Sequence, residues 1–347
     1  MIVMVSFPDN EHVEEVRQHL RAEHVVLDQA DFPERISLHC RSAAAGLRLT
    51  LRLPDGKLLD LDDVRSIWSR RIRPFGLAAH LTPVGTQFAW SECHEAISGL
   101  WYSVHAFWMN HPLADEAAQR KILQLRVATQ VGLRTPETLV TNDPAEAAAF
   151  LDRIGPGQVV RKAFRNIEEA PRVTALVGDA DRAKLKLVRH APVIFQRFVP
   201  AVADLRVTIV GDEVFAALIT SDEAHQVDYR PGLNTAEVVV HRLPAEVSSG
   251  LVALMHRLGL SYGAIDLRLT PDGEYVFLEV NPAGEYLFVS RRTGQPIPQA
   301  IAAALSRGRW TPTRSGTAAS WSPDRLRATA AGSRSAHHRR GSHDSGK

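Results

Sequence analysis

Cysteines and long apolar runs are both scarce in this chain of 347 residues. The two cysteines, Cys40 and Cys93, are too few for a disulfide framework or for a zinc site built from several cysteines, and they suit a reducing cytosol. No apolar run approaches the roughly 20 residues that a membrane helix needs. The opening MIVMVSF lacks a basic segment and leads into charged sequence, unlike a signal peptide. We therefore expect a cytoplasmic protein with no membrane association.

Several nucleotide-binding and catalytic motifs are also missing. There is no GxxxxGK[ST] loop and no GxGxxG after a strand, so P-loop and Rossmann folds lose their main support. Neither HExxH nor GxSxG occurs, so no zinc-peptidase motif or nucleophile elbow is present. The 41 basic residues nearly balance the 39 acidic ones, which argues against nucleic acid as the main partner.

Residue patterns divide the chain into three segments. Residues 1–110 open with a β-α-β pattern followed by strand-like runs, and predict an α/β N-terminal domain. Residues 111–307 combine helices with two long antiparallel hairpins, which indicates an α+β domain rather than a doubly wound sheet. Apolar spacing predicts helices over Glu11–Glu23, Gln87–Met109, Ala114–Val131, Pro144–Ile154, Asp179–Leu187, Ala245–Leu258 and Ile297–Leu305. In the third of these, the residues expected to face inward are Ile122, Leu125, Val127 and Ala128.

Residues 308–347 differ from the rest in charge and composition. They hold eight basic residues against two acidic ones, a net charge of +6, which leaves the first 307 residues at −4. The segment has little aliphatic content, so it cannot bury enough surface to offset the entropy lost on ordering. We expect a disordered basic tail that is dispensable for activity; the alternative is a basic arm for an acidic partner.

The most informative pattern lies in the second hairpin, YGAIDLRLTPDGEYVFLEVNP. If Asp272-Gly273 forms a two-residue turn, counting back places Asp266 directly opposite Glu279. Opposed residues point to one face of a sheet, and Asn281, two residues beyond Glu279, points the same way. Two carboxylates and an amide oxygen on one face suit Mg²⁺, and the alternative is a face turned toward water. The opposite face is expected to be apolar, with Ile265, Leu267, Leu278 and Val280.

Two lysines and one apolar strand indicate a nucleotide. Lys121 lies in a predicted helix and Lys162 in the strand VVRKAF, settings that favour an anionic ligand in a chain with only six lysines. Each lysine by itself is more often a surface residue with a buried stem. An adenine could lie against the strand FQRFV, where the hydrogen-bonding groups would be the Gln196 side chain and the backbone of Arg197, Phe198 and Val199.

Two further charged residues complete the candidate site. Asp204 follows the same strand after a short linker and could accept hydrogen bonds from ribose hydroxyls, although such an aspartate is more often a turn residue or a cap. Arg230, in the loop VDYRPG, could reach a phosphate, and its alternative is a solvent-exposed arginine.

Taken in order, these elements resemble the ATP-grasp superfamily. The matching elements are Lys121, Lys162, QRFV, DLRVTIVGD, and Asp266 with LEVNPAG, which together cover about residues 110–305. The resemblance narrows to the ribosomal-peptide maturases of the microviridin, or graspetide, type, because IWSRRIRPF is similar to their Trp-x-Arg-Arg element and VDYR to their Asp-aromatic-Arg loop. The resemblance implies an α+β ATP-grasp fold, in which two subdomains clasp ATP, preceded by a pre-ATP-grasp domain.

The activity implied by the resemblance is ATP-dependent ligation. Such an enzyme converts Asp or Glu side chains of a precursor peptide into acyl phosphates, and a Ser, Thr or Lys of the same peptide attacks to form a macrolactone or macrolactam. The implied cofactors are ATP and one or two Mg²⁺ ions on Asp266, Glu279 and Asn281. The implied partner is the precursor peptide, with its leader and core, and a homodimer is allowed for.

The sequence departs from the family's pattern at two positions, and two other functions are alternatives to peptide crosslinking. Arg197 follows the glutamine where the family often has an acidic residue, and Tyr229 stands where tryptophan is more familiar. The chain could instead join amino acids to a small molecule or a protein C-terminus, like the glutathione-forming and glutamate-adding ligases. It could also be a non-catalytic nucleotide-binding partner, although the intact Asp266, Glu279 and Asn281 set argues against that.

Arg70 and Arg71 supply the candidate peptide contact. As neighbours on one predicted strand they leave opposite faces, and Trp68 shares the face of Arg70 and is expected to stack on it. Arg71 is then the guanidinium expected to hold a substrate carboxylate through two hydrogen bonds. The alternative is that both arginines lie at a domain interface or in solvent.

Overall fold

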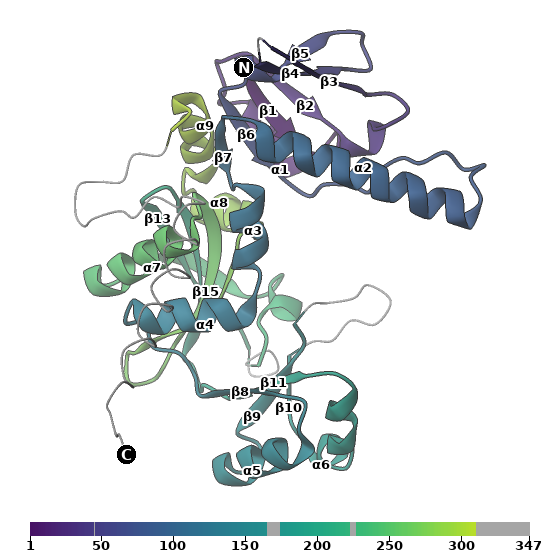
Figure 1. Ribbon diagram of the computed structural model, residues 1–347. Helices are drawn as coiled ribbons and strands as arrows, with labels where there is room; N and C mark the ends of the chain where they lie inside the picture. Colours follow the sequence, from purple (N-terminus) through teal and green to yellow (C-terminus); the bar gives the residue numbers. More distant parts are fainter. Residues whose placement is uncertain (45, 165–173, 223–226, 310–347) are drawn as a thin grey trace, which may run out of the picture. The chain divides into compact units, whose positions relative to one another are not determined.

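The computed structural model describes residues 1–44, 46–164, 174–222 and 227–309 (Figure 1). Apart from Gly308 and Arg309, the basic tail expected at residues 308–347 lies outside these ranges, so the prediction that it is disordered and dispensable stays a prediction. None of the helices in the described ranges has both the length and the apolar character that crossing a membrane requires.

The N-terminal part is built on a parallel sheet with the strand order β2-β1-β6-β7. Its strands are Ile2–Val5 (β1), His24–Leu27 (β2), Ser66–Ser69 (β6) and Phe107–Met109 (β7). A second, antiparallel sheet contains Ser37–Ala43 (β3), Gly46–Arg52 (β4) and Leu58–Asp60 (β5). The helices of this part are Glu11–Arg17 (α1) and Pro83–Ser103 (α2).

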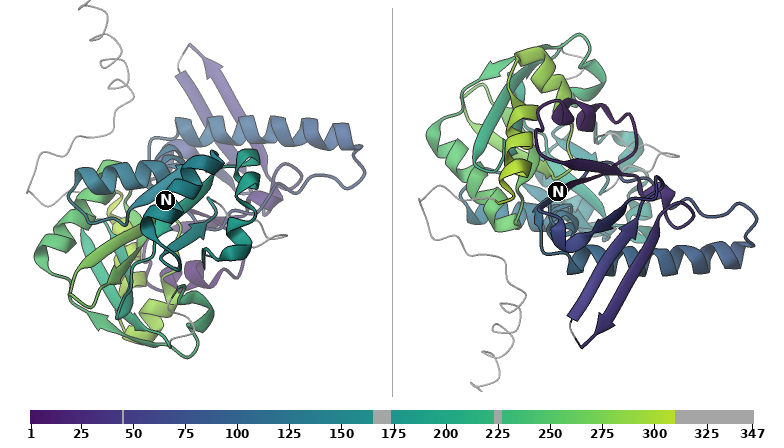
Figure 2. Two further views of the ribbon diagram at one scale, coloured as in Figure 1. Left: turned by 90° about the horizontal axis from the view of Figure 1, so that it is seen from below. Right: turned by 90° about the horizontal axis from the view of Figure 1, so that it is seen from above.

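Side chains of β1 alternate between two apolar clusters, as the period of a strand requires. Val3 and Val5 lie in one cluster, onto which α2 packs Ile97 and Trp101. Figure 2 shows α2 lying alongside the N-terminal strands. Met4 lies in the other cluster with Ile2, and this cluster also takes in residues from the C-terminal part of the chain.

The rest of the described chain is built on two antiparallel sheets. One has the order β10-β9-β11-β8 and consists of Thr138–Thr141 (β8), Val159–Lys162 (β9), Ala175–Leu176 (β10) and Val193–Arg197 (β11). The other has the order β14-β13-β12-β15-β16 and consists of Ala203–Val210 (β12), Glu213–Thr220 (β13), Glu237–His241 (β14), Tyr262–Leu269 (β15) and Tyr275–Asn281 (β16). The helical elements are Pro112–Ala118 (α3), Lys121–Gln130 (α4), Pro144–Ile154 (α5), Asp179–Arg182 (α6), Leu185–His190 (η3), Arg230–Gly232 (η5), Ala245–Leu258 (α7), Leu287–Thr293 (α8) and Ile297–Arg307 (α9).

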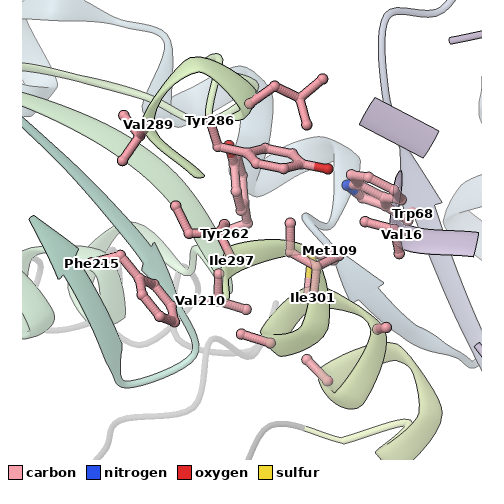
Figure 3. Close-up of a cluster of buried hydrophobic side chains, with 14 of the residues drawn as sticks. Val16, Trp68, Met109, Val210, Phe215, Tyr262, Tyr286, Val289, Ile297 and Ile301 are labelled. Carbon is pink, nitrogen blue, oxygen red and sulfur yellow. The ribbon is translucent and has the colours of Figure 1, made fainter. Parts of the chain in front are cut away.

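Helices cover the two antiparallel sheets unequally. Apolar residues of α5 and η3 pack on the sheet of β8–β11. Helices α4 and α7 pack on one face of the sheet of β12–β16, where Leu205, Val207 and Ile265 point. On the other face, α8 and α9 meet strand residues and Trp68 and Met109 of the N-terminal sheet (Figure 3). The remainder of that face carries the charged residues described below.

The predicted α+β organisation is confirmed, and α5 and α7 have the predicted bounds. The first helix ends at Arg17 because the following residues return the chain to β2, which runs parallel to β1. The second ends at Ser103 because Phe107–Met109 joins the sheet beside β6. The helix predicted from Asp179 ends at Arg182 and is followed by η3. The sequence patterns missed β5, β14 and α8.

The helix predicted over Ala114–Val131 is two helices, α3 and α4. The buried residues of α4 are Gln124, Val127 and Ala128, whereas Ile122, predicted to face inward, is 59% exposed. Gln124 is buried because its amide bonds the carbonyl oxygen of Ala118 at 2.6 Å and both backbone groups of Val280. The break places Lys121 at the first turn of α4.

Asn110 ties the N-terminal part to the sheet of β12–β16. Its Oδ1 accepts hydrogen bonds from the backbone N–H groups of Ser261 and Tyr262, both at 2.8 Å. Its Nδ2 donates to the carbonyl oxygens of Tyr262 and Pro282 at 2.9 and 3.1 Å. All four bonds are buried, so water cannot readily replace them.

We expect Asn110→Ala to lower the free energy of unfolding by about 3 kcal/mol, because buried donors and acceptors lose their partner. Urea unfolding followed by tryptophan fluorescence measures this change. Asn142→Ala, at an exposed position between β8 and α5, is the matched control and should change stability little. Equal effects in the two variants would show that the buried amide does not join the two parts.

Candidate active site

A cavity of about 410 Å³ is lined by residues of both antiparallel sheets of the C-terminal part and by α4. Its volume lies in the range of about 300–1,000 Å³ that is usual for small-ligand sites. Its apolar lining includes Leu125, Val140, Val160, Ile194, Phe198 and Leu278. Its charged lining consists of Lys121, Lys162, Arg197, Asp204, Asp228, Arg230, Asp266, Arg268 and Glu279. All the site residues predicted from the sequence line this cavity except Asn281 and Arg71.

Asp266 lies directly opposite Glu279, as predicted, but the turn between their strands is not the predicted one. Thr270 and Glu274 close a three-residue loop through a backbone hydrogen bond of 2.9 Å, and Gly273 takes the left-handed conformation, with φ of 79°. The register beside this loop is therefore one residue away from that of a two-residue turn.

A β-bulge restores the predicted pairing. The register shifts between Asp266 and Leu267, where two residues of β16 stand against one of β15. Phe277 consequently takes the place in the apolar core that was predicted for Leu278. Leu278 lines the cavity instead, which corrects its predicted position on the apolar face.

Two crossed ion pairs lie on the cavity face of β12 and β15. Asp204 is opposite Arg268 and accepts a hydrogen bond of 3.0 Å from its Nε, and Arg206 is opposite Asp266 and donates to its Oδ1 at 2.8 Å. Sequence reasoning missed Arg206 and the Arg268 pairing. A signal was available, because the tripeptide Asp-Leu-Arg occurs in both strands, and antiparallel pairing sets each aspartate against the other arginine.

Burial and charge together shift the pKa of Asp204. Burial raises the pKa of Asp204 above its ordinary value, and the neighbouring Asp266 adds to the rise, while Arg268 opposes it. The hydroxyl of Tyr229 also approaches Asp266, at 3.4 Å from Oδ1. The cavity therefore holds buried carboxylates whose charges are compensated by buried guanidinium groups.

Lys121 and Lys162 meet around Glu279. Lys121 forms an ion pair with the Glu279 carboxylate. Burial lowers the pKa of Lys162, Glu279 raises it, and Lys121, Arg230 and Arg268 lower it further. Burial raises the pKa of Glu279, but Lys121, Lys162 and Arg230 outweigh it, so the net shift is downward. One carboxylate thus faces the cations Lys121, Lys162 and Arg230, and this excess of positive charge suits an anionic ligand.

The predicted adenine-binding strand lies at the apolar part of the lining. Gln196 is buried and donates a hydrogen bond of 2.9 Å to the Thr138 hydroxyl. The backbone N–H groups of Arg197 and Phe198 bond neighbouring carbonyl oxygens, and the Val199 carbonyl accepts from Arg268 at 2.7 Å. The side chain of Arg197 lies 3.6 Å from the Glu137 carboxylate. Because these backbone groups of residues 197–199 already have partners, fewer of them are left to bond an adenine base.

Arg230 is held by Asp228, the aspartate of the same VDYR loop. Its Nε and a terminal nitrogen bond the two carboxylate oxygens of Asp228 at 2.8 and 2.9 Å, and this pairing raises the pKa of Arg230 further above its ordinary value. The same bonds orient the guanidinium at the cavity wall.

Asn281 and Arg71 lie elsewhere. The Asn281 Oδ1 accepts from the Ala283 N–H at 3.0 Å, and this residue is exposed. β6 ends at Ser69, so the prediction that Arg70 and Arg71 are neighbours on a strand is wrong. The guanidinium of Arg70 packs on the rings of Tyr262 and Tyr286, at 5.8 and 5.6 Å from their centroids, rather than on Trp68.

The residues present fit a nucleotide and a divalent cation. The apolar lining can receive a planar base, and the cation excess around Lys162 can receive phosphates. Asp266 and Glu279 offer oxygen ligands of the kind that Mg²⁺ prefers, from directly opposed positions of adjacent strands. Among the described residues, no group of three or more His, Cys, Asp and Glu side chains is arranged to hold a metal alone.

Comparisons with known families agree with this geometry. Residues 1–116 match the model described as the MvdD pre-ATP grasp domain, and residues 118–305 match the RimK-like ATP-grasp domain. The chain therefore belongs to the RimK-like ATP-grasp family, a class of ligases, and carries a pre-ATP-grasp domain of the MvdD type.

Curated relatives are similar over the ATP-grasp part. The chain is 24% identical over 195 residues to a probable alpha-L-glutamate ligase of Citrobacter koseri, covering 54% of this chain and 64% of that protein. It is 22% identical over 191 residues to the ribosomal protein bS6–L-glutamate ligase of Escherichia coli, covering 54% and 63%. The chain thus spans just under two thirds of the length of these relatives.

Solved structures are similar over nearly their whole length. The macrocyclase MdnC of Microcystis aeruginosa, bound with the precursor peptide MdnA, is 30% identical with a TM-score of 0.78, covering 88% of this chain and 99% of that one. The macrocyclase MdnB of the same organism is 31% identical with a TM-score of 0.74, covering 88% and 98%. A RiPP-associated ATP-grasp ligase of Chryseobacterium gregarium, in complex with ADP and a leader and core peptide, is 26% identical with a TM-score of 0.82, covering 91% and 99%.

We expect Lys162→Ala to weaken ATP binding by more than about tenfold, because the phosphates lose a buried cation. Isothermal titration calorimetry with ATP measures the change. Lys186→Ala, at an exposed lysine of η3, is the matched control and should bind like the wild type. Unchanged affinity in the Lys162 variant would refute the assignment of this cavity to the nucleotide.

Proposed function

We propose that this protein is an ATP-dependent ligase that crosslinks a ribosomal precursor peptide through the side chains of Asp or Glu residues. The observation that carries the proposal is the likeness to the two Microcystis macrocyclases, which includes the pre-ATP-grasp part as well as the ligase part. The products would be macrolactones or macrolactams, with ADP and phosphate. We further propose the division into a domain of residues 1–110, a ligase domain of residues 111–307 and a basic tail.

The proposed reaction has two steps. A carboxylate oxygen of the peptide attacks the γ-phosphorus of ATP, the bond from that phosphorus to the bridging oxygen breaks, and ADP leaves. A hydroxyl or amine of the same peptide then attacks the acyl phosphate carbon, releases phosphate and loses its proton. No protein nucleophile is needed, so the site must mainly neutralise charge and orient the reactants.

Residues of the cavity would supply that neutralisation. Lys121 and Lys162 would bind the phosphates, and Arg230, held in place by Asp228, would face the transferred group. Gln196, the backbone of residues 197–199 and Asp204 would hold adenosine. Asp266 and Glu279 would hold one or two Mg²⁺ ions, whose chemical contribution is to offset the charge that develops on the phosphates. Asn281 would join them by exchanging its bond to the Ala283 N–H for the ion.

A second candidate function follows from the curated relatives. The glutamate ligases match the same ATP-grasp residues, so a ligase that adds an amino acid to a protein or a small molecule would use the same cavity. The two functions differ in the mass of the product. A crosslink within one peptide removes one water, whereas addition of an amino acid increases the mass of the acceptor.

The decisive experiment uses the short peptide, rich in Thr or Ser and in Asp or Glu, that we expect to be encoded beside the gene. Incubation with the enzyme, ATP and Mg²⁺ should remove one water for each crosslink, as measured by intact-peptide mass spectrometry. Mild alkali then opens esters and spares amides. Release of ADP with no change in the mass of the peptide would refute the proposed function.

Glu279→Gln should abolish crosslinking while the protein stays folded, because the amide keeps the shape of the side chain but cannot supply the charge that a cation requires. Glu274→Gln is the control, since Glu274 lies at the opposite end of the same hairpin in an ion pair with Arg134. Water loss from the peptide and circular dichroism are measured for both variants. Wild-type turnover by the Glu279 variant would remove this carboxylate from the cation site.

A further inference from the structure

A second cavity, of about 740 Å³, shares no lining residue with the first. Asn10, Arg71, Leu233, Glu285 and Arg291 are among the residues that line it. The two cavities lie close together near η5, because Arg230, its first residue, lines the first cavity and Leu233, the residue after its end, lines the second.

A single buried guanidinium connects the two cavities. Arg206 donates to Oδ1 of Asp266, in the lining of the first cavity, at 2.8 Å. It also donates to the carbonyl oxygen of Glu285, which lines the second, at 3.0 Å. A ligand in the second cavity would therefore lie near the residues proposed to act on ATP.

Asn10 brings an unsatisfied donor to this second cavity. The residue is 3% exposed, and its Oδ1 accepts from the backbone N–H of His12 at 3.1 Å, which fixes the orientation of the amide. Its Nδ2 has no hydrogen-bond partner among the described residues. Leaving such a buried donor unpaired costs about 1–3 kcal/mol, so an acceptor oxygen brought within its reach would be bound favourably. Because Nδ2 has almost no accessible surface, the lining must open beside Asn10 before a ligand reaches it.

The Arg71 guanidinium, which also lines the second cavity, has a carboxylate partner that a ligand can replace. Its side chain is 54% exposed and pairs with Glu285, whose side chain is 45% exposed. An ion pair this exposed contributes at most about 1 kcal/mol, so a second carboxylate can take the place of Glu285.

The backbone around this cavity is strained. Arg71 and Asp9 have φ angles of 50° and 61° and are the non-glycine residues with positive φ in the described ranges. Both line the second cavity. Strain of this kind is retained mainly at ligand-binding sites, because there it places a side chain that an ordinary conformation would not.

The other arginines of this cavity each have two partners. Arg291 bonds the carboxylates of Glu11 and Glu15 at 2.9 and 3.0 Å, and Arg292 donates to two backbone carbonyl oxygens. Burial, together with Arg70 and Arg71, lowers the pKa of His12 to about 3, so this imidazole is neutral at physiological pH. Of these groups, Arg71 is the cation with a single carboxylate partner for a ligand to replace, whereas a ligand on Arg291 would have to replace two.

We propose that the second cavity binds an acidic side chain of the peptide substrate, with the Arg71 guanidinium and the Asn10 Nδ2 as donors. A carboxylate fits both, because it accepts two bonds from a guanidinium and a further one from an amide. Glu285 occupies the guanidinium until the peptide displaces it. This inference rests on the proposed function, since it takes the substrate to be an acidic peptide.

The test compares two fluorescein-labelled synthetic peptides of Thr and Gly that differ in carrying Glu or Gln at the same positions. Fluorescence anisotropy should give at least about tenfold tighter binding of the Glu peptide by the wild type. Arg71→Gln should abolish this preference. Arg291→Gln removes the same charge from the lining of the same cavity and should retain it. Asn10→Asp keeps the acceptor that bonds His12 but replaces the free donor, and should reduce the preference.

Circular dichroism of each variant shows whether it is folded. Arg71→Lys supplies a second variant, because lysine keeps the positive charge but cannot donate two parallel hydrogen bonds to a carboxylate. Its preference should lie between those of the wild type and Arg71→Gln. Equal binding of the two peptides by the wild type, no binding of the Glu peptide, or equal losses in both glutamine variants would overturn the inference. The proposed function is judged separately by water loss from the precursor, so a preference for Glu without crosslinking would count against that function alone.

Discussion

The structure depends on how firmly the backbone after Glu279 is held. Each carbonyl oxygen from Val280 to Glu285 accepts a hydrogen bond, and all the donors except the Gly284 N–H come from outside this segment. They are Gln124 for residue 280, the Gly284 N–H for 281, Asn110 for 282, Arg70 for 283, Arg70 and Tyr262 for 284, and Arg206 for 285. A segment bonded in this way cannot shift without breaking several buried bonds at once, so the position of Glu279 at its start is fixed.

This arrangement gives the N-terminal part a role in the ATP-grasp site. Arg70 donates to the carbonyl oxygens of Ala283 and Gly284 at 2.9 and 3.0 Å, and its guanidinium packs on two buried tyrosines. Of the two adjacent arginines, Arg70 therefore supports the backbone beside the proposed cation site, while Arg71 is left for a ligand. The pre-ATP-grasp part thus supports the backbone at the candidate active site and also lines the second cavity.

The sequence predicted the fold and most of the residues lining the first cavity, because both follow from the spacing of apolar residues in helices and the alternation of side chains along strands. The predicted hairpin correctly placed the Asp266 and Glu279 carboxylates opposite each other. It did so because two errors cancelled: the loop between the strands is one residue longer than predicted, and the β-bulge in β16 absorbs that extra residue. No local pattern marks a bulge, so the position of Leu278 was mispredicted. Asn10, Arg206 and Glu285 were missed because their roles depend on contacts between residues far apart in the chain. The repeated Asp-Leu-Arg was readable, but only once the two strands were known to pair.

The two cavities use the same chemical pair, a guanidinium with a carboxylate, for opposite purposes. The Arg206–Asp266 pair is buried, with side chains 8% and 12% exposed, and Arg206 has a further bond to a carbonyl oxygen. Separating it would leave a buried charge, so it serves as a fixed part of the site. The Arg71–Glu285 pair is half exposed, and water can solvate either partner. Burial therefore decides which pair is structural and which can exchange, and the exchangeable pair lies where a peptide can reach it.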